Sequence, residues 1–341
     1  LAMDAALSLS DASALRKLCE GERVWKEVRP VKLWLAAKVL HNKTLLLRAL
    51  FLLQWQQWMQ TGVTPIAFVA AFIWYAILLA AGSREPWRWL RYMPAVGAGV
   101  ASVWLLQWWQ GTLNYHPHPQ DSQSMTQEIV HWVLFVGIPE EAAKLCCFAF
   151  FLPVLLHRDS DTKAALTAGC VGLGFALDEN MHYFLDYGTS IALGRLLTAN
   201  MMHVLLTGLV GWHFYHLCRS RFHSAGEFLT AFIGAAAAHG IYNFSSSEFA
   251  AKWGFDVVGV IILAFGTRLY FAHLQLSNEA LKTTVISRTS VFCVGSAVLT
   301  GILINAAVWE QRDLMAATGV LKDALGLAVV GLFYIREFRE V

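Results

Sequence analysis

Four short polar motifs stand out in this sequence because each lies inside a stretch that is otherwise apolar. They are, in chain order, Glu140, Glu141 and Lys144, then Glu179, then His203, and finally His239 with Asn243. Ionisable side chains inside a membrane are costly, and they usually mark a functional site. Carboxylates and imidazoles together can hold a metal ion or transfer protons, so these motifs indicate a site for hydrolysis or for proton movement.

The charges of the motifs fit one divalent cation. The three glutamates and Lys144 sum to −2, with the histidines neutral. Catalytic zinc usually takes three protein ligands from His and Glu plus a water, and the candidate ligands here are Glu179, His203 and His239. Protonation of two glutamates would neutralise the motifs equally well. The sequence alone does not separate these two possibilities.

The remaining polar residues are candidate catalytic residues. One carboxylate of the pair Glu140–Glu141 would be the general base and accept a proton from the attacking water, whose pKa zinc lowers to about 7. Which of the two acts stays open, because neighbours on a helix point about 100° apart. Lys144 would orient or charge-balance the pair, and Asn243 would hydrogen-bond the developing oxyanion.

The composition is that of a membrane protein. Of the 341 residues, 57% are hydrophobic and 15% are charged, whereas about 25% are charged in an ordinary soluble domain. Because about 20 apolar residues cross a bilayer, the pattern predicts an all-α, polytopic membrane helix bundle. About ten transmembrane helices are expected, at 45–60, 62–82, 92–110, 130–152, 164–185, 191–218, 228–244, 255–273, 290–309 and 316–336. The first is the weakest and could instead lie along the surface. Pro139 predicts a kink before the glutamate pair.

The positions of Lys and Arg give the orientation. With ten crossings and a cytoplasmic N-terminus, 19 of the 26 cations fall inside, and only Lys252 and Arg312 fall outside. This agrees with the positive-inside rule. We therefore expect an integral, multi-pass protein with both termini cytoplasmic.

Depth in the membrane gives independent support for one shared site. Counted at ~1.5 Å per residue from the predicted outer ends, Glu140 lies ~16 Å deep and Glu179 ~9 Å deep. His203 lies ~11 Å deep and His239 ~8 Å deep. All four fall in the outer half, although two of their helices run inward and two run outward. Side chains at a common depth can converge on one cavity.

In this order the motifs resemble the PrsW family of intramembrane metalloproteases, distant relatives of the CAAX prenyl proteases. That family shows Glu-Glu-x-x-Lys, then Phe-x-x-x-Glu followed by Asn, then a His, then His-x-x-x-Asn or Asp. The matching residues are Glu140, Glu141, Lys144, Phe175, Glu179, Asn180, His203, His239 and Asn243. The resemblance covers about residues 128–245. It implies an endopeptidase of the bacterial inner membrane that cuts membrane-anchored proteins, such as an anti-sigma factor, near the outer face. Zinc is the cofactor hypothesis.

The chain is expected to divide into four regions. They are a cytoplasmic basic segment at 1–44, N-terminal transmembrane helices at 45–127, a catalytic four-helix membrane core at 128–245 and C-terminal transmembrane helices at 246–341. The expected surroundings are the lipid bilayer, with no nucleic-acid partner. Two other functions stay open. A proton-coupled transporter also uses buried Glu, Lys and His, although no internal repeat is seen. A non-catalytic membrane sensor could keep the same residues.

Overall fold

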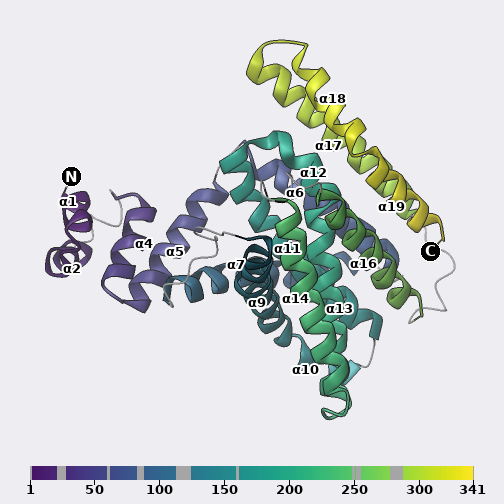
Figure 1. Ribbon diagram of the computed structural model, residues 1–341, viewed down its shortest axis with the longest axis horizontal. Helices are drawn as coiled ribbons and strands as arrows, with labels where there is room; N and C mark the ends of the chain where they lie inside the picture. The colour runs from purple at the N-terminus through teal and green to yellow at the C-terminus, as the bar shows by residue number, and fades with distance from the viewer. Residues whose placement is uncertain are drawn as a thin grey trace. The chain divides into compact units, whose positions relative to one another are not determined.

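The computed structural model describes residues 2–20, 28–59, 62–82, 88–112, 124–158, 161–247, 250, 255–276 and 287–340. Throughout these residues the regular structure is helical, without a β-strand. The predicted all-α class is therefore confirmed. Figure 1 shows long helices running side by side, as expected when apolar segments pack lengthwise.

Helices occur at every predicted membrane segment. They are α5 (Lys43–Trp58), α6 (Thr64–Gly82), α7 (Arg88–Thr112), α8 (Met125–His131), η1 (Trp132–Gly137), α9 (Ile138–Ala149), α11 (Asp161–Tyr187), η2 (Thr189–Ile191), α12 (Ala192–Leu197), α13 (Ala199–Arg219), α14 (Ala225–Ser245), α16 (Asp256–Leu276), α17 (Arg288–Gln311), α18 (Ala316–Gly326) and α19 (Ala328–Glu340). The short α10 (Leu152–Arg158) follows α9.

The number of crossings is a separate question from the number of helices. Among the described residues, three helical stretches are long and apolar enough to cross a membrane, namely Thr189–Arg219, Val257–Leu274 and Arg288–Gln311. A bent pair, Ala316–Gly326 with Ala328–Phe338, would make a fourth span with a 50° bend. The count of ten stays a prediction. α11 is long enough to cross a bilayer but carries Asp178, Glu179 and Asn180, which a membrane helix can hold where it faces a bundle interior.

A π-helical turn lies just before Pro139, where a kink is predicted; the kink itself stays a prediction. Residues 132–137 form η1, and the Ile138 N–H donates to the Val133 carbonyl five residues back. Proline has no N–H to continue an α-helical ladder, and π-turns frequently occur at functional sites. The glutamate pair therefore begins its helix one residue out of α-helical phase with the segment before it.

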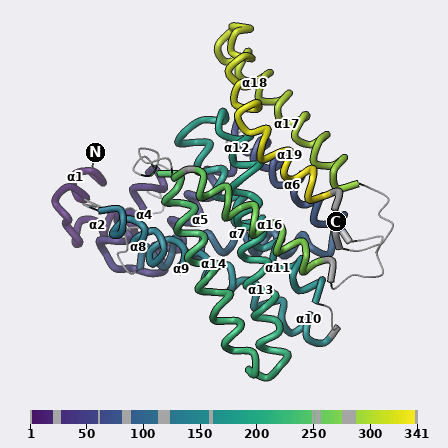
Figure 2. Tube along the Cα trace, turned by 45° about the vertical axis from the view of Figure 1, so that its right-hand side comes forward, coloured from purple at the N-terminus to yellow at the C-terminus, as the bar shows by residue number. Residues whose placement is uncertain are grey.

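Helix α11 occupies the centre of the larger unit, which comprises Gly62–Val103 and His118–Val341. It contacts α6, α9 and α13, and α13 contacts α14 and α16. α13 and α14 form a hairpin whose turn lies at the lower end of both views (Figures 1 and 2). The backbone of α11 lies very close to those of α7 and α13. A Cβ at Gly174 would lie 1.9 Å from the Val96 carbonyl oxygen, and one at Gly172 would lie 2.2 Å from the His203 carbonyl oxygen. These glycines allow the helices to touch, as expected for small residues in membrane bundles.

The smaller unit comprises Leu1–Thr61 and Trp104–Pro117. Its helices α1 (Ala2–Ser8), α2 (Ala12–Glu20), α4 (Pro30–Val39) and α5 enclose a core of their own. The core residues include Met3, Leu15, Leu33, Ala36 and Ala49. Most of the basic N-terminal region is thus folded into helices, which its charge pattern did not predict. The four-region division of the chain stays a prediction.

Candidate active site

The four polar motifs come from four helices. Glu140, Glu141 and Lys144 lie on α9, Glu179 lies on α11, His203 lies on α13 and His239 lies on α14. The side chains of Glu140, Glu141, Lys144, Glu179, His203 and His239 meet in one network of hydrogen bonds and ion pairs, which we call the carboxylate–histidine cluster. Most of the cluster is buried, and the Glu179 side chain is its most exposed member at 21%.

Glu141 is the fully bonded carboxylate of the cluster. Its Oε1 accepts a hydrogen bond from Lys144 Nζ at 2.8 Å and another from His239 Nδ1 at 2.8 Å. Its Oε2 accepts from the Thr207 hydroxyl at 3.3 Å. A carboxylate can only accept, so Nδ1 of His239 carries a proton, and in the neutral ring Nε2 then carries a lone pair. Glu141 therefore orients His239 and is poorly placed to accept a further proton.

Glu140 has the opposite surroundings. Its Oε2 lies 3.4 Å from His239 Nε2 and 3.6 Å from Lys144 Nζ, both beyond a good hydrogen bond. This oxygen is buried, and no described residue donates a hydrogen bond to it. Two lone-pair atoms, Glu140 Oε2 and His239 Nε2, thus face each other. Such an arrangement needs a proton or a cation between them, because a buried polar atom without a partner is costly.

His203 has a partner at each ring nitrogen. Lys144 Nζ lies 2.9 Å from Nδ1, and Glu179 Oε2 lies 2.9 Å from Nε2. Because an ammonium only donates, Nδ1 accepts and Nε2 carries the proton that it gives to Glu179. A metal ion bound by His203 would have to replace one of these two hydrogen bonds.

The group of side chains whose spacing could hold a metal ion differs from the predicted ligand set in one residue. Glu140, His203 and His239 each offer a ligand atom, and these atoms lie within 4.8 Å of one another. Glu179, the predicted carboxylate ligand, lies beside His203 and outside this group. The free oxygen of Glu140 and the lone pair of His239 fit a divalent cation, and the donor set of one carboxylate and two imidazoles suits zinc.

Arg195 on α12 belongs to the site, although sequence reasoning gave it no role. Its Nη2 donates to Glu179 Oε2, and its Nε donates to the Asn180 side-chain oxygen. With Arg195 the net charge of the cluster is −1 instead of −2. The available signal was an arginine inside an otherwise apolar predicted span, 191–218. Such a cation needs a partner, and Glu179 is one of the carboxylates on the preceding predicted span that could supply it.

Asn243 lies one turn after His239 on α14 and is partly buried. No hydrogen bond joins its side chain to the cluster among the described residues. The structure therefore places it near His239 along the chain and does not bring it into the network.

Comparison with known proteins extends this picture along the chain. Residues 85–271 match the model of the PrsW family intramembrane metalloproteases. The match covers more than half of the chain and includes all four motif helices. The chain belongs to the PrsW family. It is therefore an integral membrane protein with the helical architecture described above.

A named PrsW protein gives a second comparison. The chain is 26% identical over 151 residues to Protease PrsW of Geobacillus kaustophilus (strain HTA426). The aligned part is 43% of this chain and 63% of that protein, so the chain spans less than two thirds of the relative's length. No solved structure matches the chain.

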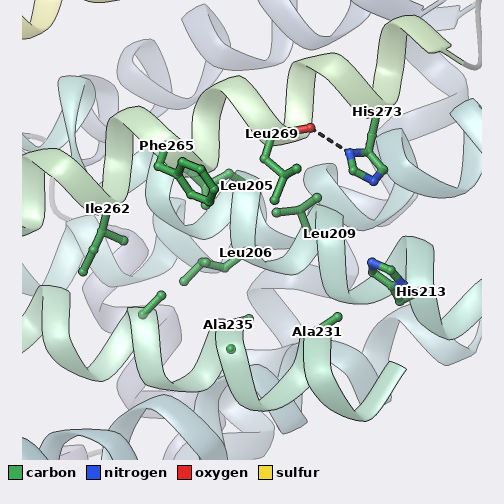
Figure 3. A pocket seen from close by; sticks show the side chains of 13 residues that line it. Leu205, Leu206, Leu209, His213, Ala231, Ala235, Ile262, Phe265, Leu269 and His273 are labelled. Atoms are coloured by element: carbon green, nitrogen blue, oxygen red, sulfur yellow. Dashed lines mark hydrogen bonds between the residues drawn. The ribbon is translucent and has the colours of Figure 1, made fainter. Parts of the chain in front are cut away.

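A cavity of about 340 Å³ lies between α13, α14 and α16 (Figure 3). Its lining is almost entirely aliphatic or aromatic, with His213 and His273 at one end. His203 and His239 do not line it, although Ala238 does and directly precedes His239. The polar cluster and the apolar cavity thus use different faces of α14.

Proposed function

We propose that this chain is an intramembrane endopeptidase that hydrolyses peptide bonds of membrane-anchored proteins. The observation that carries the proposal is the free, buried Oε2 of Glu140 facing the Nε2 of His239 at 3.4 Å. Membership of the PrsW family gives the reaction class. Buried polar groups are usually hydrogen-bonded, so an unbonded carboxylate oxygen beside His239 marks a position where a proton, a cation or a substrate group fits.

Zinc is the proposed cofactor, and Glu140, His203 and His239 are the residues that would hold it. When bound, zinc would polarise the peptide carbonyl and lower the pKa of water. Metal-bound histidines usually donate their other ring N–H to a carboxylate. Each histidine here donates in this way: His239 to Glu141, and His203 to Glu179. Glu179, predicted from the sequence as a ligand, is therefore proposed to orient a ligand instead.

Glu140 is also the candidate acceptor of the proton that leaves the attacking water, as an alternative to its role as a metal ligand. Of the predicted pair, Glu141 already accepts from three donors, whereas Glu140 has an unbonded oxygen. This oxygen fits either a metal ligand or the acceptor of the proton that leaves the attacking water. Lys144 contacts both carboxylates and balances their charge. Asn243 is proposed to hydrogen-bond the oxyanion once a substrate is present.

The substrate and location are proposed on the family resemblance and on the charge pattern. The substrate would be a membrane-anchored protein such as an anti-sigma factor, cut near the outer face. The inner membrane of a bacterium is the expected location. These assignments depend on the orientation of the helices, for which the distribution of Lys and Arg is the support.

Metal analysis combined with a cleavage assay tests this function. The purified protein is expected to contain one zinc per chain and to cleave a membrane-anchored reporter peptide in liposomes. Glu140→Gln should abolish cleavage, and His239→Ala should abolish both cleavage and zinc binding. If Glu140→Gln retains zinc, Glu140 is the proton acceptor; if it loses zinc, Glu140 is a ligand.

The matched control is Glu227→Gln, an exposed glutamate at the start of α14. It should leave cleavage and zinc content unchanged. Normal cleavage by Glu140→Gln and by His239→Ala would refute the proposed function. A protein that binds zinc and cleaves no reporter would instead support the non-catalytic sensor.

A further inference from the structure

Arg195 lies on a helix that is held firmly in place. α12 is only six residues long and is separated from α13 at Thr198, whose φ and ψ are −117° and −70°. The Trp74 indole N–H donates to the Leu196 carbonyl at 2.6 Å, and the Tyr334 hydroxyl donates to the Leu197 carbonyl at 2.7 Å. Both aromatic side chains are fully buried. The two residues that follow Arg195 are therefore fixed by helices from elsewhere in the fold.

The Arg195 guanidinium contacts three residues of α11 at once. It donates to Glu179 Oε2 and to Asn180 Oδ1, and it stacks on Tyr183 with its central carbon 3.7 Å from the ring centroid. The Arg195 and Glu179 side chains are 14% and 21% exposed, so both lie towards the outside of the cluster. Only a planar fork with several donors can make these contacts together.

Both hydrogen-bond acceptors of Arg195 are also bonded to residues of α13. Glu179 Oε2 also accepts from His203 Nε2 at 2.9 Å. Because Arg195 can only donate, Asn180 Oδ1 must be its acceptor, and this fixes the direction of the amide. The Asn180 Nδ2 group then donates to Asn200 Oδ1 at 2.6 Å, with both amides fully buried. Asn200 lies three residues before His203, on the same helix.

We propose that Arg195 is a positioning residue for His203. It holds the Glu179 carboxylate against the Nε2–H of His203, and it holds Asn180 against Asn200 one helical turn away. His203 is thereby kept in one tautomer and one ring orientation, with Nδ1 directed to the cluster. The inference rests on the proposed function, since it assigns His203 to the proposed zinc site.

Two roles of Arg195 are distinguishable by a conservative substitution. If Arg195 served only to balance charge, Arg195→Lys would keep nearly the wild-type zinc affinity, because the positive charge remains. If it positions Glu179 and Asn180 together, lysine fails, because a point charge on a flexible stem cannot replace the two directed bonds. Arg195→Met removes both functions.

Zinc affinity, measured by competition with a chelator, is the main readout and needs no substrate. Removing an outer residue that orients a metal ligand typically costs about 10- to 100-fold in affinity or activity. We expect losses in this range for Arg195→Lys and for Arg195→Met, with kcat lowered and KM within about threefold of the wild type. Arg268→Lys and Arg268→Met are the matched controls, since Arg268 is 67% exposed and pairs only loosely with Glu337 at 4.0 Å.

Tyr183→Leu provides a milder variant if loss of Arg195 prevents folding. It removes the ring under the guanidinium without changing any charge, and it should weaken zinc binding about 2- to 30-fold. Wild-type zinc affinity in folded Arg195→Lys, or in Tyr183→Leu where the arginine variants do not fold, would overturn the inference. Absence of zinc from the wild-type protein would instead refute the proposed metal site itself.

Discussion

The same substitution at the two adjacent glutamates of α9 should affect different properties. Glu140→Gln should abolish cleavage, whereas Glu141→Gln should lower the free energy of unfolding. Glu140→Gln and Glu141→Gln each remove one carboxylate charge and change the side-chain volume little. Both positions are buried, at 8% and 1% exposure. The two residues differ in their partners. A comparison of the two variants therefore separates the carboxylate that stabilises the fold from the carboxylate that is needed for cleavage.

The contacts of each residue set the expected magnitudes. Glu141 accepts two charge-assisted bonds of 2.8 Å from Lys144 and His239, and one longer bond from Thr207. Breaking a buried ion pair by removing one partner costs about 3–5 kcal/mol, and we expect a loss of that size for Glu141→Gln. Glu140 Oε2 makes no hydrogen bond, and its nearest partners lie at 3.4 and 3.6 Å. Glu140→Gln should therefore lower the free energy of unfolding by much less than Glu141→Gln, because it breaks no hydrogen bond at this oxygen.

The free energy of unfolding in lipid bicelles, measured by steric trapping without added metal, is the appropriate assay. Cleavage of the reporter peptide is measured in parallel. Glu140→Gln should be stable and inactive, whereas Glu141→Gln should be destabilised. Equal destabilisation of both variants, or a greater loss for Glu140→Gln, would contradict the hydrogen-bond pattern on which the proposed roles depend.

Three further predictions concern the surroundings of the cluster. Gly172→Ala should destabilise the fold by about 1–3 kcal/mol and lower cleavage, because its Cβ would lie 2.2 Å from a carbonyl oxygen of α13. Gly301→Ala is the control for unfolding, since a Cβ there would have nothing within 4 Å. Tyr334→Phe should cost about 1–3 kcal/mol in unfolding free energy, since the Leu197 carbonyl loses its 2.7 Å partner; an unchanged value would show that this bond is dispensable. Asn243→Ala should lower kcat about 10²- to 10³-fold at nearly constant stability, and normal kcat would remove Asn243 from the mechanism.

Much of the site could be predicted because membrane burial makes polar residues conspicuous. Glu140, Glu179, His203 and His239 were expected at a similar depth, and the structure brings all four into one cluster. Depth along a helix axis follows from residue counting at a fixed rise. The direction of a side chain around the axis does not, since it also depends on breaks such as η1. For this reason the sequence did not show that Glu140, and not Glu179, completes the group of possible ligands.

Arg195 and the N-terminal helices were missed for different reasons. Arg195 belongs to none of the motifs, and its three contacts lie on a different helix, α11, which spacing along the chain does not reveal. In the N-terminal unit, small apolar residues such as Ala36 and Ala49 form the core. A charge count over residues 1–44 does not detect such a pattern, because each helix is short and buries only one narrow face.

The π-helical turn at Trp132–Gly137 makes the bundle sensitive to chain length at one place. It accommodates one residue more than an α-helix would over the same rise. Deleting a single residue there would let the helix continue in α-helical form with its two flanking segments in nearly the same orientation, because the π-turn already absorbs the extra residue. Adding a residue in plain α-helical geometry would instead turn everything before it by about 100° relative to Glu140 and Glu141, so the segment tolerates loss of one residue better than gain of one.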